Sequence, residues 1–240
     1  MNSWHQLPRA AFDLETTGRD PQTARIVTAS IILVNGRGET LQHHEWLACP
    51  EIPIPAEAAA IHGITNERAQ AEGGDPSAVT AEVAEVLAGM FAADIPVLAF
   101  NACYDFTVLA RECERFGLTA PRPLPVIDPY ILDKQVDRFR RGKRTLTAMA
   151  AHYGVDFENA HTSAADVAAT LSVAAVLAEK YPELQGDART LHESQIGWAA
   201  GQAASFQEYL RRRDPEAVID GSWPLRAAPD REPGTVLDPA

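Results

Sequence analysis

The sequence of 240 residues has few cysteines, no long apolar segment and no excess of basic residues. Its longest apolar run, residues 26–34, is interrupted by two hydroxyl side chains and is too short to span a membrane. The N-terminal residues lack the basic and apolar parts of a secretion signal. The three cysteines have no paired metal-ligand spacing, which favours reduced core residues in a cytoplasmic protein. They are Cys49, Cys103 and Cys113.

The formal net charge is −12, which argues against a protein that coats nucleic acid without specificity. The charge is still compatible with an enzyme that holds a few nucleotides through metal ions and a local basic patch. Residues 138–144 place five cations in seven positions. This segment is either a solvated loop or a phosphate-facing patch, and the sequence leaves both open.

Periodicity predicts a mixed α/β fold. Residues 9–15, 25–34 and 39–48 are typical of strands, and the turn at Asn35-Gly36 predicts an antiparallel meander. We expect short strands at 96–100 and 124–128. Helices are expected at 56–61, 66–71, 76–92, 103–117, 129–136, 145–153 and 163–180. Together these elements predict a three-layer α/β sandwich with a central mixed five-stranded sheet.

The composition changes after residue 182. We therefore expect one domain over residues 8–182 and a C-terminal helical extension with a Pro-rich tail over 183–240. The extension should contain a helix at about 190–213, and the tail from Gly221 is expected to be poorly ordered. For its aromatic residues we favour docking on the main domain over a partner surface. These are Trp198, Phe206, Tyr209 and Trp223.

Four carboxylates and a histidine stand at predicted strand ends and helix starts. Asp13 and Glu15 fall on one face of the first strand because the side-chain period of a strand is two. Asp105 and Asp166 lie in the first turns of predicted helices with apolar faces. Gathered carboxylates repel one another and are costly to desolvate unless a cation neutralises them. Taken together with His161, they favour divalent-metal and phosphate chemistry.

Each of these residues also has an ordinary structural interpretation. Asp13 and Glu15 are compatible with a solvated strand end, and Asp105 and Asp166 with carboxylates that complement a helix dipole. A lone histidine in a loop, such as His161, is usually a surface residue. Because His161 precedes Asp166 by five residues, it is also a candidate general base.

In combination, the motifs resemble the superfamily of 3′→5′ exonucleases with four acidic residues and a histidine (the DEDDh type). This group includes the epsilon subunit of bacterial DNA polymerase III, ribonuclease T and oligoribonuclease. The resemblance covers roughly residues 8–180 and rests on motifs at 12–18, 100–105 and 161–166, and on His62-Gly-Ile-Thr65. Asp128 resembles the strand-end aspartate of the family, whereas Phe100 stands where many members have histidine.

The resemblance implies an RNase H-like fold and two Mg²⁺ or Mn²⁺ ions. Asp13 would bridge the ions, Glu15 and Asp166 would complete the first site, and Asp105 would help to hold the second. His161 would act as the base that deprotonates the attacking water. The family pattern also implies that the terminal nucleotide is contacted by Thr16, Thr17, Gly18, His62 and Asn101.

The polymer is not fixed by this chemistry. We favour a DNA exonuclease of proofreading or repair type that acts on single strands or frayed 3′ ends, with an RNA exonuclease as the alternative. A non-catalytic nucleic-acid-binding module and an RNase H-like endonuclease are less favoured, because all four carboxylates and the histidine are present. A polymerase or another protein partner is expected to bind, if at all, through residues 183–240.

Overall fold

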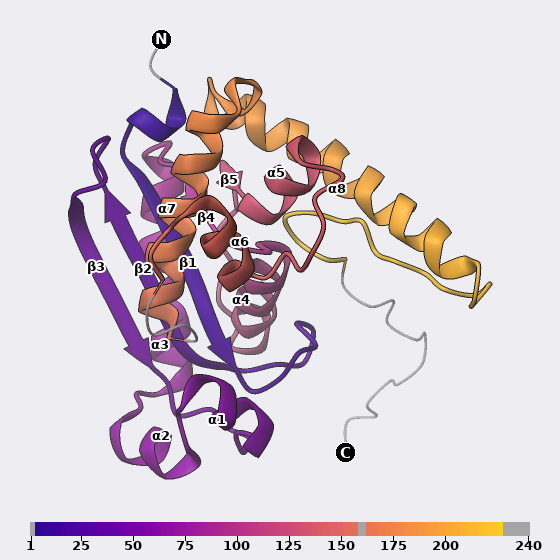
Figure 1. Cartoon of the computed structure of the whole chain (residues 1–240). Helices are drawn as coiled ribbons and strands as arrows, with labels where there is room; N and C mark the ends of the chain where they lie inside the picture. Colours follow the sequence, from indigo (N-terminus) through magenta and orange to yellow (C-terminus); the bar gives the residue numbers. More distant parts are fainter. Residues whose placement is uncertain (1–2, 158–161, 228–240) are drawn as a thin grey trace.

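The computed structural model describes residues 3–157 and 162–227, and its centre is a five-stranded mixed sheet in the order β3-β2-β1-β4-β5 (Figure 1). Strands β1, β2 and β3 form the antiparallel meander, and β4 and β5 run parallel to β1. The strand bounds are Arg9–Thr16, Ile26–Val34, Thr40–Leu47, Val97–Leu98 and Val126–Ile127. The predicted α/β sandwich around a mixed five-stranded sheet is confirmed.

Helices cover both faces of this sheet (Figure 1). Their ends follow local sequence signals: Asp75 caps α3 by accepting a hydrogen bond from the Ala78 N–H at 2.9 Å, with Pro76 as the first helical residue. The helices are α1 (Ala56–His62), α2 (Asn66–Glu72), α3 (Pro76–Ala92), α4 (Cys103–Arg115), α5 (Pro129–Val136), α6 (Leu146–Tyr153), α7 (Ser163–Lys180) and α8 (Ala188–Arg211), with short 3₁₀ turns at Trp4–Gln6 and Pro182–Leu184.

The alternation of β1 divides the hydrophobic core between the two faces of the sheet. Phe12 and Leu14 pack with residues of α3 and α4, whereas Ala11 packs with residues of α6 and α7. Because β1 is covered on both sides, polar side chains near its carboxyl end are largely withdrawn from water.

Helix α8 covers the edge strand β5. The Val126 N–H donates to His192 Nδ1 at 3.0 Å, and Gln195 Nε2 donates to the Val126 carbonyl at 3.1 Å. The Asp128 N–H donates to Gln195 Oε1 at 2.7 Å. Side chains of α8 therefore satisfy the backbone groups that an edge strand leaves open.

The chain returns to the main body after α8. Trp223 is buried with 7% of its surface exposed, and the Arg226 N–H donates to Thr107 Oγ1 at 2.9 Å. The expectation of a poorly ordered tail from Gly221 is thus wrong for residues 221–227, because a buried tryptophan anchors them. Residues 228–240 of that predicted tail lie outside the described residues.

Across residues 3–157 and 162–227, none of the helices combines the length and the apolar character that a membrane span requires.

Candidate active site

Three carboxylates from two distant parts of the chain meet at the carboxyl end of β1. Asp13 and Glu15 stand two residues apart on β1, and Asp166 lies in the first turn of α7. One ligand oxygen from each of the three lies within 4.8 Å of the others, and all three side chains are half-buried. The strand period and the N-terminus of α7 therefore bring these predicted residues together.

Asp105 lies beside this group. It is in the first turn of α4, its surface is 3% exposed, and its Oδ1 accepts a hydrogen bond from the Leu14 N–H at 3.0 Å. This bond fixes the start of α4 to the middle of the Asp13–Glu15 segment. Asp105 does not belong to the three-residue cluster within 4.8 Å.

The gathered charges raise the pKa values of these carboxyl groups. Burial raises the pKa of Asp13 well above its usual range, and the charges of Asp105, Asp166 and Glu15 raise it further. Burial, followed by the charge of Asp166, raises the pKa of Glu15 to about 7. Burial also raises the pKa of Asp105, although the hydrogen bond from Leu14 opposes the shift.

The residues fit a divalent cation. They offer hard carboxylate oxygens, the ligands that Mg²⁺ and Mn²⁺ prefer, and a cation would neutralise the charges that now raise one another's pKa values. On this chemistry Asp13, Glu15 and Asp166 are the residues that would hold it.

Tyr104, the residue before Asp105, holds the turn that follows β1. The hydroxyl groups of Thr16 and Tyr104 contact each other, and Thr16 Oγ1 also donates to the Gly18 carbonyl at 2.9 Å. Thr17 Oγ1 accepts from the Arg25 N–H at 2.9 Å. Both threonine hydroxyls, predicted to contact substrate, are thus used within the chain. Gly18 is different, since a Cβ added there would meet nothing within 4 Å and the space beside it is open.

His62 and Glu15 line the same cavity, which has a volume of about 480 Å³. His62 ends α1 and is 7% exposed, and its Nδ1 accepts from the Ile64 N–H at 3.1 Å. The proton of the neutral ring therefore belongs on Nε2, which is buried. Burial lowers the pKa of His62, and an interaction with the Thr16 backbone opposes this shift. His62 thus lies at the edge of the carboxylate site.

Asn101 and Asp128 shape the entry to α4. Asn101 is exposed with a left-handed φ of 61°, and its N–H donates to Asp128 Oδ1 at 3.0 Å. Asp128 Oδ2 accepts from the Ala102 N–H at 2.9 Å and from Trp223 Nε1 at 3.2 Å. Burial raises the pKa of Asp128 to about 6, against the effect of these donors. The fifth predicted catalytic residue, His161, lies outside the described residues.

Sequence reasoning missed the roles of Tyr104 and Trp223. Tyr104 immediately precedes Asp105, so its place in the motif was a usable signal. Trp223 lies 95 residues from its partner Asp128, and no local pattern connects the two.

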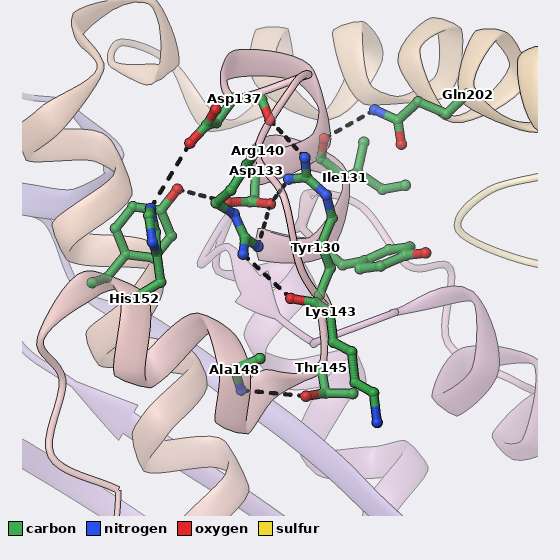
Figure 2. Close-up of polar contacts among 12 residues, drawn as sticks. Tyr130, Ile131, Asp133, Asp137, Arg140, Lys143, Thr145, Ala148, His152 and Gln202 are labelled. Atoms are coloured by element: carbon green, nitrogen blue, oxygen red, sulfur yellow. Dashed lines mark hydrogen bonds and ion pairs between the residues drawn. The ribbon is translucent and has the colours of Figure 1, made fainter.

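The basic segment 138–144 is divided by the fold. Arg140 and Arg144 turn inward and form ion pairs with the fully buried Asp133, which also accepts a hydrogen bond from the Tyr153 hydroxyl at 2.6 Å (Figure 2). The other three cations of the segment are exposed. They are Arg138, Arg141 and Lys143. Two of the five cations are therefore structural.

Comparison with known proteins places these features in a family. The family model described as Exonuclease (RNase T) matches residues 10–174. A protein of Rhodobacter capsulatus described as DNA polymerase III subunit epsilon-like is 30% identical over 171 residues, which are 69% of this chain and 23% of that protein. The DNA polymerase III subunit epsilon of Rickettsia prowazekii is 30% identical over 184 residues, 75% of each chain. This chain thus spans less than a quarter of the Rhodobacter protein and three quarters of the Rickettsia subunit.

The fold is also that of a solved nuclease. A crystal structure of E. coli exonuclease I in complex with a dT13 oligonucleotide superposes with a TM-score of 0.61 at 19% identity, over 75% of this chain and 42% of that chain. At this identity the likeness shows the RNase H-like exonuclease fold. Since the family model covers more than half of the sequence and includes all three carboxylates of the cluster, the chain belongs to this family of exonucleases.

Proposed function

We propose that the protein is a metal-dependent 3′→5′ exonuclease that removes nucleoside 5′-monophosphates from the 3′ end of DNA. The observation that carries the proposal is the meeting of Asp13, Glu15 and Asp166 within 4.8 Å, inside a chain that belongs to an exonuclease family. We assign the catalytic unit to residues 8–182 and treat residues 183–240 as an extension of it.

In this proposal Asp13, Glu15 and Asp166 hold the cation, and Asp105 contributes charge to a second ion from its place against Leu14. When bound, two Mg²⁺ or Mn²⁺ ions supply charge neutralisation at the scissile phosphate and a water of lowered pKa. The protein itself holds the carboxylates in position. Strand β1 packs against core residues on both faces of the sheet, and the hydrogen bond from the Leu14 N–H to Asp105 attaches α4 to β1.

His161 is proposed as the general base. The support is its sequence position, five residues before Asp166, and the chemistry of imidazole, the side chain most often used as a general base. His62, which lines the same cavity as Glu15, and the open space beside Gly18 are proposed to receive the terminal nucleotide, together with Asn101. Thr16 and Thr17 are assigned to shaping this pocket through their bonds within the turn.

DNA is favoured as the polymer because the relatives are named as subunits of DNA polymerase III or as similar to one, and the solved exonuclease I was crystallised with a DNA oligonucleotide. An RNA exonuclease of ribonuclease T type is the alternative, with the same carboxylates and histidine. A polymerase partner for residues 183–240 and a cytoplasmic location stay predictions.

A 5′-labelled single strand tests the reaction and its direction. With Mg²⁺, the protein should produce a ladder of labelled strands that shortens one nucleotide at a time, whereas attack from the 5′ end would release a labelled mononucleotide at once. Chelation of the metal and Asp13→Asn should each stop the reaction, and Glu85→Gln, an exposed glutamate on α3, is the matched control.

Matched DNA and RNA strands, and duplexes with a 3′ mismatch, identify the preferred polymer. A circular single strand should resist the protein, and its cleavage would indicate an endonuclease instead. Activity of Asp13→Asn equal to that of the unaltered protein would overturn the assignment of the site.

A further inference from the structure

A groove between α5 and α8 lies outside the carboxylate site. Its volume is about 760 Å³, and α8, which forms one wall, begins after the end of the family match at residue 174. Gln202 Nε2 of α8 donates to the Ile131 carbonyl of α5 at 3.1 Å and joins the two walls (Figure 2). The groove is lined by Tyr130, Lys134, Gln135, Arg138, Arg144 and, from α8, Gly197, Trp198, Gly201, Gln202, Ser205, Phe206 and Tyr209.

The charge of this groove is opposite to that of the protein. Three of its lining residues are cationic and none is acidic, in a chain of net charge −12. Four other surface cavities among the described residues, including the one beside Glu15, each contain at least one glutamate. Lys134 and Arg138 are the cations available to a ligand, because Arg144 is paired with Asp133. The groove is therefore complementary to a polyanion.

The groove also presents flat aromatic faces to solvent. Phe206 and Tyr209 are 49% and 53% exposed, and their rings are nearly parallel, at 13° with centroids 6.4 Å apart. The expectation that these two residues dock on the main domain is wrong, whereas Trp198 is partly buried against both core clusters. Lys134 Nζ lies 4.8 Å from the centroid of the Tyr130 ring. A basic groove with exposed aromatic rings is the pattern of single-strand binding sites.

Tyr130 connects this groove to the loop before α4, the helix that carries Asp105. Its ring packs edge-on against Phe100 with centroids 5.8 Å apart, and its N–H donates to Asp128 Oδ1 at 3.0 Å. Phe100 directly precedes Asn101, at the entry to the helix of Asp105. In Figure 2 the ring of Tyr130 points away from the buried Asp133 cluster. Contacting side chains therefore lead from the groove to the loop before α4.

We propose that this groove binds the 5′ part of a single-stranded nucleic acid whose 3′ end occupies the carboxylate site. The proposal rests on the proposed function and adds a strand path supplied by α8. Phosphates lie near Lys134 and Arg138, and bases stack on Phe206 and Tyr209. An acidic peptide suits the groove less well, because peptide anchors fill desolvated pockets and these rings are about half exposed.

Two double variants separate the contributions of stacking and charge. For Phe206→Ala/Tyr209→Ala, kcat/KM on a thymidine dodecanucleotide should fall by about tenfold or more, since each stacked base contributes a factor of about 5 to 150. A trinucleotide offers few nucleotides beyond the one at the carboxylates, and if the groove holds the 5′ part of the strand it should be hydrolysed within about twofold of the unaltered rate. Lys134→Gln/Arg138→Gln should flatten the slope of log K against log salt for the dodecanucleotide by about 1.4.

Ile196→Ala is the matched control for the aromatic pair, because Ile196 is 45% exposed on α8 and does not line the groove. Arg37→Gln, in the exposed turn between β2 and β3, is the control for charge. Both controls should behave like the unaltered protein. Phe206→Leu/Tyr209→Leu keeps apolar surface but removes the flat rings, and it should lose as much dodecanucleotide activity as the alanine pair.

Fluorescence anisotropy with labelled dodecanucleotide in EDTA measures binding without hydrolysis, and so it tests the groove even if the proposed reaction is wrong. Equal losses on the trinucleotide and the dodecanucleotide, or unchanged anisotropy in both double variants, would overturn the strand path. The same holds if an acidic peptide binds in a Phe206-dependent manner while oligonucleotide affinity is unaffected. Absence of hydrolysis by the unaltered protein, with groove-dependent binding intact, would refute only the reaction.

Discussion

Glu15→Gln is expected to make the metal-free protein more stable while abolishing its activity. In the fold the pKa of Glu15 rises from an ordinary 4.5 to about 7, through burial and then the charge of Asp166. The ionised form is therefore disfavoured in the folded state relative to the unfolded state. As the pH rises from 4.5 to 7, the unfolded chain loses this proton first, and the free energy of unfolding decreases.

The size of the effect follows from the shift. A difference of roughly 2.5 pKa units, at 1.36 kcal/mol each, corresponds to about 3 kcal/mol at pH 8. Glutamine carries no charge, so Glu15→Gln should recover up to that amount at pH 8 and almost none near pH 4. For a chain of this size the gain at pH 8 corresponds to a rise in Tm of roughly 6–12 °C.

Urea unfolding in EDTA, followed by circular dichroism from pH 4.5 to 8.5, measures this difference. Mg²⁺ should raise the stability of the unaltered protein more at pH 8 than at pH 5, and it should raise that of Glu15→Gln much less. Glu85→Gln, on the exposed face of α3, serves as the control and should match the unaltered protein in its pH dependence and in its response to Mg²⁺. A Glu15→Gln protein that is less stable than the unaltered protein in EDTA at pH 8 would refute the electrostatic reasoning.

Three further predictions concern residues that support the site. Thr162 caps α7, and its Oγ1 accepts a hydrogen bond from the Ala165 N–H at 3.3 Å. Thr162→Ala should lower the free energy of unfolding by about 1 kcal/mol, measured with urea. The same variant should bind Mg²⁺ more weakly in calorimetry, because Asp166 lies in the capped turn. Trp223→Phe removes a donor to the Asp128 carboxylate and should cost about 1.5–3 kcal/mol, measured by thermal unfolding; an unchanged Tm would contradict the role of this bond. Asp133→Ala leaves two largely buried arginines without their partner and should cost about 3–5 kcal/mol, whereas Glu85→Ala, at an exposed position on α3, should change stability little.

The sequence predicted the helices, the strands and the carboxylate cluster well at positions where a single local rule determines the structure. Asp13 and Glu15 share a face because strand geometry leaves no other arrangement, and the bounds of α3 and α7 follow from their capping residues. The family motifs then indicated which distant segments of the chain contribute to the same site. The base assigned to His161 stays a prediction.

The rest depends on tertiary contacts that no local pattern records. Residues 138–144 look uniformly basic, and only the position of the buried Asp133 decides which arginines turn inward. The prolines after Gly221 are typical of a loop, but they do not indicate that Trp223 donates a hydrogen bond to the buried carboxylate of Asp128. Phe206 and Tyr209 lie on the same helix as Trp198, and which of these rings is covered depends on the width of the groove beside α5.

The bond between Trp223 and Asp128 has a consequence for the order in which the enzyme matures. A nascent chain that has emerged as far as residue 182 already contains every carboxylate of the site, but α8 does not yet cover β5 and Asp128 lacks its tryptophan donor. The backbone around Asn101 therefore receives its full set of contacts only after Trp223 has been synthesised and has reached Asp128. The loop before α4 is thus completed late, after synthesis has passed well beyond residue 174, where the match to the exonuclease family ends.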